Sequence, residues 1–112
     1  MNEVIRKELK QNYKDSPSTA GIYLIRNKLN KMSLIASAQN AQGVLNRHLF
    51  ELKFGQHRNK ALQAQWNEQG ESAFEFLLIT HVKPDEKNIK LALETLLDKY
   101  TLEYEITDEN SY

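Results

Sequence analysis

The segments Gly21-Ile22-Tyr23-Leu24-Ile25-Arg26 and Met32-Ser33-Leu34-Ile35-Ala36 are the parts of this 112-residue sequence that indicate its fold most directly. Both are short and rich in β-branched, aromatic and other apolar residues, which is typical of β-strands. The polar link Asn27–Lys31 between them has the length and composition of a hairpin connection. The segments therefore predict two antiparallel neighbouring strands.

Two helices with defined ends are predicted after the hairpin. Asn40 can cap the first, because its side-chain oxygen accepts hydrogen bonds from free backbone N–H groups, and Gly55 can end it in a left-handed conformation. Asn59 and Gly70 can cap and close a second, shorter helix. The expected buried stripe of the first helix is Ala41, Val44, Leu45, His48, Leu49 and Leu52.

The flanking segments add a third strand and two more helices. Ala73–Val82 has apolar residues at both odd and even positions, so we expect a central strand covered on both faces. Pro84-Asp85 is expected to open a last helix, and Glu3–Tyr13 to form a first one that ends before Ser16–Thr19. Leu102–Tyr112 is acidic and is interpreted as a frayed strand or a tail.

Length and composition fit one small globular domain, with 40% hydrophobic and 27% charged residues. We expect an α+β fold with a small central antiparallel sheet of about three strands flanked by helices. An N-terminal helix and linker at 1–19 should precede a core at 20–100 and an acidic C-terminal segment at 101–112.

Several classes of protein are excluded by what the sequence lacks. There is no cysteine, which removes disulfides, zinc–thiolate sites and cysteine nucleophiles. His48, His57 and His81 are too scattered along the chain to predict a metal cluster. No apolar run has the roughly 18 residues of a membrane span, and the charged, amphipathic Met1–Lys10 does not resemble a signal peptide. We expect an intracellular, soluble, cytoplasmic protein without a membrane partner.

The formal net charge of zero conceals an uneven distribution along the chain. Residues 1–60 contain 11 Lys and Arg against 4 Asp and Glu, and residues 61–112 contain the remaining 4 and 11. A basic half favours an anionic partner such as nucleic acid. The alternative is that the two halves attract each other within one fold.

A series of short motifs runs along the chain from residue 21. The segments are Gly21-Ile22-Tyr23, Leu34-Ile35-Ala36-Ser37, Asn46-Arg47-His48-Leu49, Gly55-Gln56-His57-Arg58-Asn59 with Leu62-Gln63 and Trp66, and Gly70-Glu71 with Phe74 and Phe76. In this order they resemble the signature motifs of the GIY-YIG nucleases, most closely the compact nuclease domains of homing endonucleases in phages and mobile elements. The spacing has no gaps from residue 21 to about residue 66, and the resemblance extends to about residue 100.

This resemblance implies hydrolysis of a DNA phosphodiester with one divalent metal, Mg²⁺ or Mn²⁺. Two tyrosines would handle the proton or position the water, an arginine would neutralise developing charge, and a glutamate would ligate the metal. The first tyrosine is present as Tyr23, and the histidine as His48. The second tyrosine falls on Leu34 and the arginine on Val44, while Ala36 replaces a glycine.

The glutamate position stays open between Glu94 and Leu93, depending on the direction of counting, and helical periodicity favours the buried Leu93. We therefore expect a degenerate member of the family in which no residue is catalytic. Tyr23, His48 and Glu94 would be remnants at the family's positions. No metal or other cofactor is expected, except Mg²⁺ or Mn²⁺ through Glu94 if the protein is active. Tyr23 and His48 have the simpler interpretation of core residues.

Three functional hypotheses remain. The first is an inactive DNA-binding or regulatory module, with nucleic-acid contacts at Arg47, Lys53, His57, Arg58, Asn59 and Lys60. The second is a protein-interaction module, inhibitor or homodimer that uses Leu34, Val44, Phe50 and Phe54. The third is a metal-dependent endonuclease with a rearranged site that employs Tyr23, Arg47, His48 and Glu94.

Overall fold

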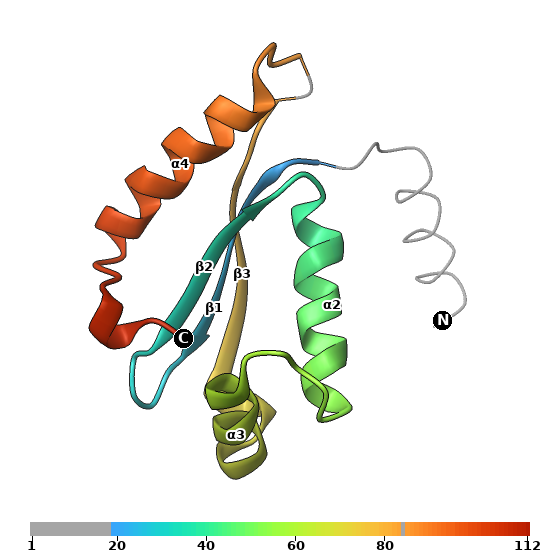
Figure 1. Cartoon of the computed structure of the whole chain (residues 1–112), viewed down its shortest axis with the longest axis vertical. Coiled ribbons are helices and arrows are strands. Elements are labelled where there is room, and N and C mark those ends of the chain that lie inside the picture. Colours follow the sequence, from blue (N-terminus) through green and yellow to red (C-terminus); the bar gives the residue numbers. More distant parts are fainter. Residues whose placement is uncertain (1–18, 84) are drawn as a thin grey trace.

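The computed structural model describes residues 19–83 and 85–112 and contains one three-stranded antiparallel sheet (Figure 1). Its strands are β1 (Gly21–Asn27), β2 (Ser33–Ala38) and β3 (Phe74–His81), in the order β2-β1-β3. The predicted α+β class and the antiparallel sheet are confirmed, as is the hairpin. The expectation that the third strand is central was wrong, because β1 is central and β3 lies at an edge.

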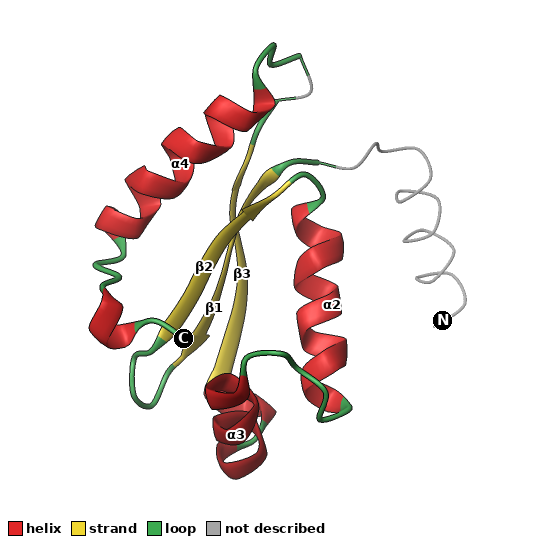
Figure 2. Ribbon diagram, viewed as in Figure 1, coloured by secondary structure: helices red, strands yellow, loops and turns green. Residues whose placement is uncertain are grey.

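Three helices accompany the sheet within the described residues: α2 (Ala41–Lys53), α3 (Lys60–Gln69) and α4 (Ile89–Glu103) (Figure 2). Short 3₁₀ turns lie at Glu71–Ala73 (η1) and Asp108–Asn110 (η2). The predicted first helix at Glu3–Tyr13 lies outside the described residues. None of the helices described at 19–83 and 85–112 combines the length and apolar character needed to cross a bilayer.

The predicted helix caps on α2 and α3 are confirmed. The Asn40 side chain accepts from the backbone N–H of Gly43, and the Asn59 side chain accepts from that of Leu62. Gly55 follows α2 with φ +71°, and Gly70 closes α3 with φ +89°, both in the region that glycine tolerates best. Local capping chemistry therefore sets the ends of these two helices.

The last helix begins later than expected, at Ile89 and not at Pro84-Asp85. Asn88 is the residue that starts it, because its side chain accepts from the backbone N–H of Leu91. Residues 85–88 form a connecting loop between β3 and α4.

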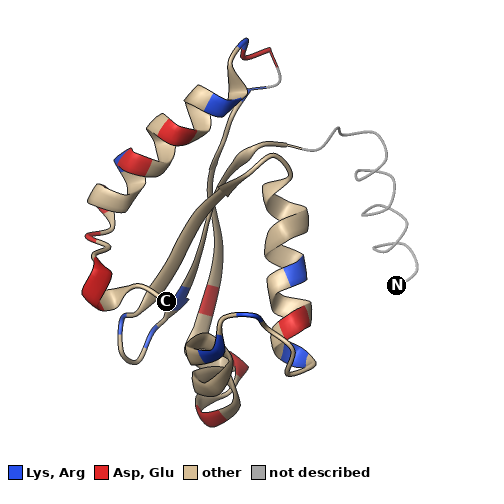
Figure 3. Cartoon of the chain, viewed as in Figure 1, with Lys and Arg blue, Asp and Glu red and all other residues tan. Residues whose placement is uncertain are grey.

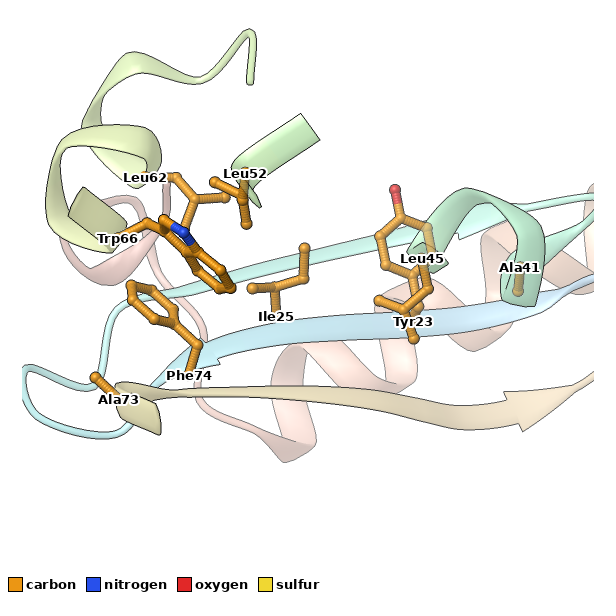
Figure 4. Close-up of a cluster of buried hydrophobic side chains, with 9 residues drawn as sticks. All are labelled: Tyr23, Ile25, Ala41, Leu45, Leu52, Leu62, Trp66, Ala73 and Phe74. Atoms are coloured by element: carbon orange, nitrogen blue, oxygen red, sulfur yellow. The ribbon is translucent and has the colours of Figure 1, made fainter. Parts of the chain in front are cut away.

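The sheet separates two hydrophobic clusters, because side chains alternate between the faces of β1. Tyr23 and Ile25 point to the face covered by α2 and α3, whereas Ile22 points to the face covered by α4 (Figures 1 and 4). The first cluster consists of Tyr23, Ile25, Ala41, Leu45, Leu52, Leu62, Trp66, Ala73 and Phe74. The second cluster consists of Ala20, Ile22, Val82 and Leu93, with partly buried residues of α4 packed against it.

The pairing of β1 with β3 contains a bulge. Ile22 lies opposite Thr80 and Tyr23 lies opposite Leu78, so Ile79 is an additional residue in β3. Next to the bulge, β3 passes so close to Gly21 that a Cβ atom there would lie 2.3 Å from the carbonyl oxygen of Thr80. The first glycine of the quoted motif is thus required for close packing of two strands.

The C-terminal residues fold back onto the hairpin, in contrast to the frayed strand or tail predicted for them. The backbone N–H of Tyr112 donates to the Ser33 carbonyl at 2.9 Å. Its hydroxyl group donates to Gln65 and accepts from the Asn27 side chain. Asn27, which is 0% exposed, also donates to Gln69 and accepts from the Leu29 N–H. We call Asn27, Gln65, Gln69 and Tyr112 the Asn27 network.

Candidate functional site

A chain of hydrogen bonds connects β1, α2 and the loop that leads to α3. The Tyr23 Oη atom lies 2.9 Å from Nε2 of His48, and Nδ1 of His48 lies 2.7 Å from Nε2 of His57. The backbone N–H of Asn59 donates to Nδ1 of His57 at 3.0 Å. His48 and His57 are therefore neighbours, although their separation in the sequence gave no sign of it. We call these four groups the histidine chain.

His57 is 6% exposed and is oriented by a buried glutamine of α3. Gln63 accepts from the His57 backbone N–H at 2.9 Å and donates to the Leu52 carbonyl at 3.1 Å. The turn at Gly55 brings the loop back along α2. His57 lies against His48 because the end of α2, the loop after it and α3 act together. The sequence does not predict this contact.

The histidine chain lies beside a pocket of about 300 Å³. Arg47 and Glu51 of α2 are at its wall and form an exposed ion pair at 3.6 Å, of the kind that adds little stability. Arg58 lines the pocket from the loop between α2 and α3. The lining residues are Tyr23, Val44, Arg47, His48, Glu51 and Arg58.

The electrostatics of the site favour neutral histidines and a neutral tyrosine. Burial lowers the pKa of His48 below its ordinary value of 6.5, with His57 and Arg58 acting in the same direction against Glu51. Burial also lowers the pKa of His57, opposed by Glu51 and assisted by Arg58. The pKa of Tyr23 is raised by burial, and Arg58 opposes that rise.

These shifts predict how stability depends on pH. Because the folded histidines resist protonation, the unfolded chain binds more protons below about pH 6.5. We expect the free energy of unfolding to be highest between about pH 7 and 9 and to fall as the pH drops below 6.5. The raised pKa of Tyr23 predicts that the free energy of unfolding falls again as the pH rises above about 10.

Urea unfolding at a series of pH values measures this profile. The substitution His48→Gln should flatten the acid side of the curve, whereas His81→Gln, at an exposed residue of β3, should not. An acid limb that is equally steep in both variants would contradict the assignment.

The aliphatic residues Leu34 and Val44, at which the motif resemblance would place a tyrosine and an arginine, lie on the same face as Tyr23. Leu34 pairs with Ile25 across the hairpin, and both Leu34 and Val44 pack against the first cluster while remaining partly exposed. Val44 also lines the pocket. Ala36 pairs with Tyr23 itself. The structure therefore brings positions 34, 36 and 44 to one place, with aliphatic side chains at all three.

The candidate metal-ligand position lies elsewhere. Leu93 is buried in the second cluster, on the opposite face of the sheet from Tyr23, and its neighbour Glu94 is exposed. In contrast, Glu51 lies at the pocket, and ligand-type atoms of His48, Glu51 and His57 fall within 4.8 Å of one another. The i, i+3 spacing of His48 and Glu51 was the available sequence signal for this group.

The other predicted contact residues surround the same end of α2. Lys53 is exposed and lies 3.8 Å from Glu71, Lys60 is exposed, and the Asn59 side chain is occupied as a helix cap. Phe50 and Phe54 are 62% and 64% exposed, with ring centroids 4.5 Å apart. Figure 3 shows basic residues on this part of α2 and on the loop, with an acidic residue between those of α2, whereas α4 carries residues of both signs and the segment after it is acidic.

Comparison with solved structures shows that the fold is similar to that of a known class, a nuclease catalytic domain with a GIY-YIG-like fold. The catalytic domain of the homing endonuclease I-TevI matches with a TM-score of 0.62 and 28% identity, over 83% of this chain and 95% of that domain. A variant of that domain, with a glutamate-to-alanine substitution, matches with a TM-score of 0.61 and 28% identity, over 84% and 91%. No protein-family model and no curated protein sequence matches the chain.

Proposed function

We propose that this chain is a non-cleaving module that binds the DNA backbone through the pocket beside the histidine chain. The supporting observation is the composition of that pocket, in which two guanidinium groups, Arg47 and Arg58, accompany the phenol of Tyr23. Guanidinium groups donate paired, charge-assisted hydrogen bonds that suit phosphate oxygens. The likeness to a homing endonuclease catalytic domain makes DNA the natural source of the phosphate.

The loss of cleavage is inferred from three positions. Leu34 has no hydroxyl group with which to move a proton, and Val44 has no charge with which to stabilise a transition state. Leu93 is buried behind the sheet, and Glu94 lies on the helix that covers that same rear face. A regulatory role, in which the protein occupies a DNA site without cutting it, follows from binding without chemistry.

Binding to a short DNA duplex at 50 mM salt tests this proposal. We expect affinity to fall steeply with salt, and the substitutions Arg47→Ala and Arg58→Ala each to weaken binding about tenfold. Each should also reduce the salt slope by roughly one. Lys90→Ala, on the exposed side of α4, removes one charge far from the pocket and is the matched control.

Absence of binding by the unmodified chain at 50 mM salt would exclude the proposal. Equal losses in all three variants would also count against it, because such losses indicate a general charge effect with no defined site.

A rearranged nuclease is the second candidate, and one observation favours it. Glu51 supplies a carboxylate at the pocket wall beside Tyr23 and His48, where the predicted Glu94 does not lie. A hard divalent cation prefers such oxygen ligands. A plasmid cleavage assay tests this candidate.

A protein-interaction module is the third candidate, supported by the exposed pair Phe50 and Phe54. Leu34 and Val44 contribute less to it, since they pack against the first cluster. A molar mass by light scattering that is independent of concentration, together with no captured partner, would count against this candidate.

A further inference from the structure

The histidine chain begins at a group whose role in hydrogen bonding is fixed. The Asn59 backbone N–H is a donor and has no lone pair to offer, so Nδ1 of His57 must be the acceptor in their 3.0 Å contact. A neutral His57 then carries its hydrogen on Nε2. One backbone amide thus selects the tautomer of this side chain.

The same reasoning extends along the chain. Nε2–H of His57 faces Nδ1 of His48 at 2.7 Å, so that nitrogen must accept, and the hydrogen of His48 resides on Nε2. Nε2–H of His48 in turn donates to Tyr23 Oη at 2.9 Å. The tyrosine oxygen is therefore an acceptor in this contact, and its own hydrogen points away from His48.

We infer that the Asn59 amide, acting through His57 and His48, makes Tyr23 a hydrogen-bond donor to a phosphate oxygen positioned by Arg47 and Arg58. This inference rests on the proposed function, since the anion is the DNA phosphodiester. The ligand class that fits is a fully ionised phosphodiester, which offers acceptors alone to one phenol and two guanidinium groups. His57 is a positioning residue, because it acts on the ligand through His48 and Tyr23.

The surroundings of the chain support neutral histidines. His48 faces Glu51 and Arg47 from its own helix and Arg58 and His57 from the loop, and burial lowers its pKa despite the opposing effect of Glu51. Protonation of His57 would place a hydrogen on Nδ1, directly against the Asn59 N–H. A metal ion on Nε2 of His57 would also move the hydrogen to Nδ1. The arrangement therefore favours a hydrogen-bond chain over a metal site.

The tautomers are directly measurable. In protein with ¹⁵N-labelled histidine at pH 7.5, long-range ¹H–¹⁵N correlation spectra should show hydrogens on Nε2 of both His48 and His57. A hydrogen on Nδ1 of either neutral ring would overturn the inference. This readout requires no ligand, so it stands even if the protein does not bind DNA.

Two substitutions at position 57 separate positioning from packing. His57→Gln retains an N–H donor near the place of Nε2, so His48 should keep its Nε2–H tautomer. His57→Ala removes the donor, so His48 should populate both tautomers. With a short DNA duplex as the probe at 50 mM salt, we expect near-normal affinity for the glutamine variant and a loss of several-fold for the alanine variant.

Tyr23→Phe removes the donated hydrogen and should weaken duplex binding about tenfold, the loss of one hydrogen bond to a charged acceptor. Thermal unfolding of each variant checks that the fold persists. Unchanged affinity in Tyr23→Phe, or an identical His48 tautomer in the alanine and glutamine variants, would contradict the inference. Absence of binding by the unmodified chain, with the predicted tautomers intact, would refute the proposed function and the ligand assignment while leaving the hydrogen-bond chain in place.

Discussion

Supercoiled plasmid incubated with the purified chain and Mg²⁺ or Mn²⁺ should remain uncut. The chemistry that the resemblance to GIY-YIG nucleases implies uses a second phenol and an arginine, and the matching positions 34 and 44 of this chain are Leu and Val. Loss of one charge-stabilising donor typically costs about 10²- to 10³-fold in rate, and loss of a proton-handling group roughly another 10²-fold. The two losses together predict a cleavage rate about 10⁴-fold or more below that of a domain that has both groups.

The measurement is the appearance of nicked and linear plasmid on a gel over hours, with and without chelator. Tyr23→Phe and Glu51→Gln serve as paired variants, because both residues line the pocket. Metal-dependent cutting that disappears in both variants would establish the rearranged nuclease. Cutting that persists unchanged in both would show that neither Tyr23 nor Glu51 takes part in it.

Replacing Asn27 by leucine should destabilise the fold by about 2–4 kcal/mol. Asn27 is fully buried, and the two hydrogens of its side-chain amide are shared among acceptors on Gln65, Gln69 and Tyr112, while its carbonyl oxygen accepts from the hairpin N–H of Leu29. Each hydrogen bond contributes about 1 kcal/mol net, and buried groups left without a partner cost more. Leucine satisfies none of these partners.

Denaturant unfolding with a two-state fit gives the difference in free energy. Lys28→Ala changes the next residue, which is exposed, and should stay within about 0.5 kcal/mol of the unmodified chain. A change below about 1 kcal/mol for Asn27→Leu would show that water readily replaces the network. The Tyr112 backbone contact with Ser33 should then persist in both variants.

The parts of the fold that depend on short-range chemistry were predictable from the sequence. The hairpin followed from two apolar runs around a polar link, and the starts of α2 and α3 followed from Asn40 and Asn59. The start of α4 was predicted too early, at Pro84-Asp85, because proline suits the first turn of a helix, whereas the helix begins after Asn88, whose side chain caps it. The prediction of a central third strand was wrong as well, because β1 is central. Apolar residues on both faces of a strand indicate that helices cover both faces, but they do not indicate its position in the order of strands.

The candidate site was predictable in part, for a related reason. Tyr23 and His48 lie on regular elements whose inward faces follow from periodicity, and the structure brings them into contact. His57 lies in a loop whose path depends on Gln63 and on the turn at Gly55, so periodicity carries no information about its neighbours. No role is assigned to Glu51 from the sequence, whereas the structure places it at the pocket beside Tyr23 and His48.

The additional residue of β3 has a bearing on which insertions and deletions this chain can accept. Leu78 and Thr80 pair with the consecutive residues Tyr23 and Ile22, so Ile79 changes the register of β3 against β1 by one position. Removal of Ile79 would make Leu78 and Thr80 adjacent, opposite the adjacent residues Tyr23 and Ile22, and would leave a regular antiparallel register. A related sequence that lacks this one residue would therefore keep the phenol directed toward the histidines, whereas a deletion elsewhere in β3 would reverse the facing of the positions on one side of it.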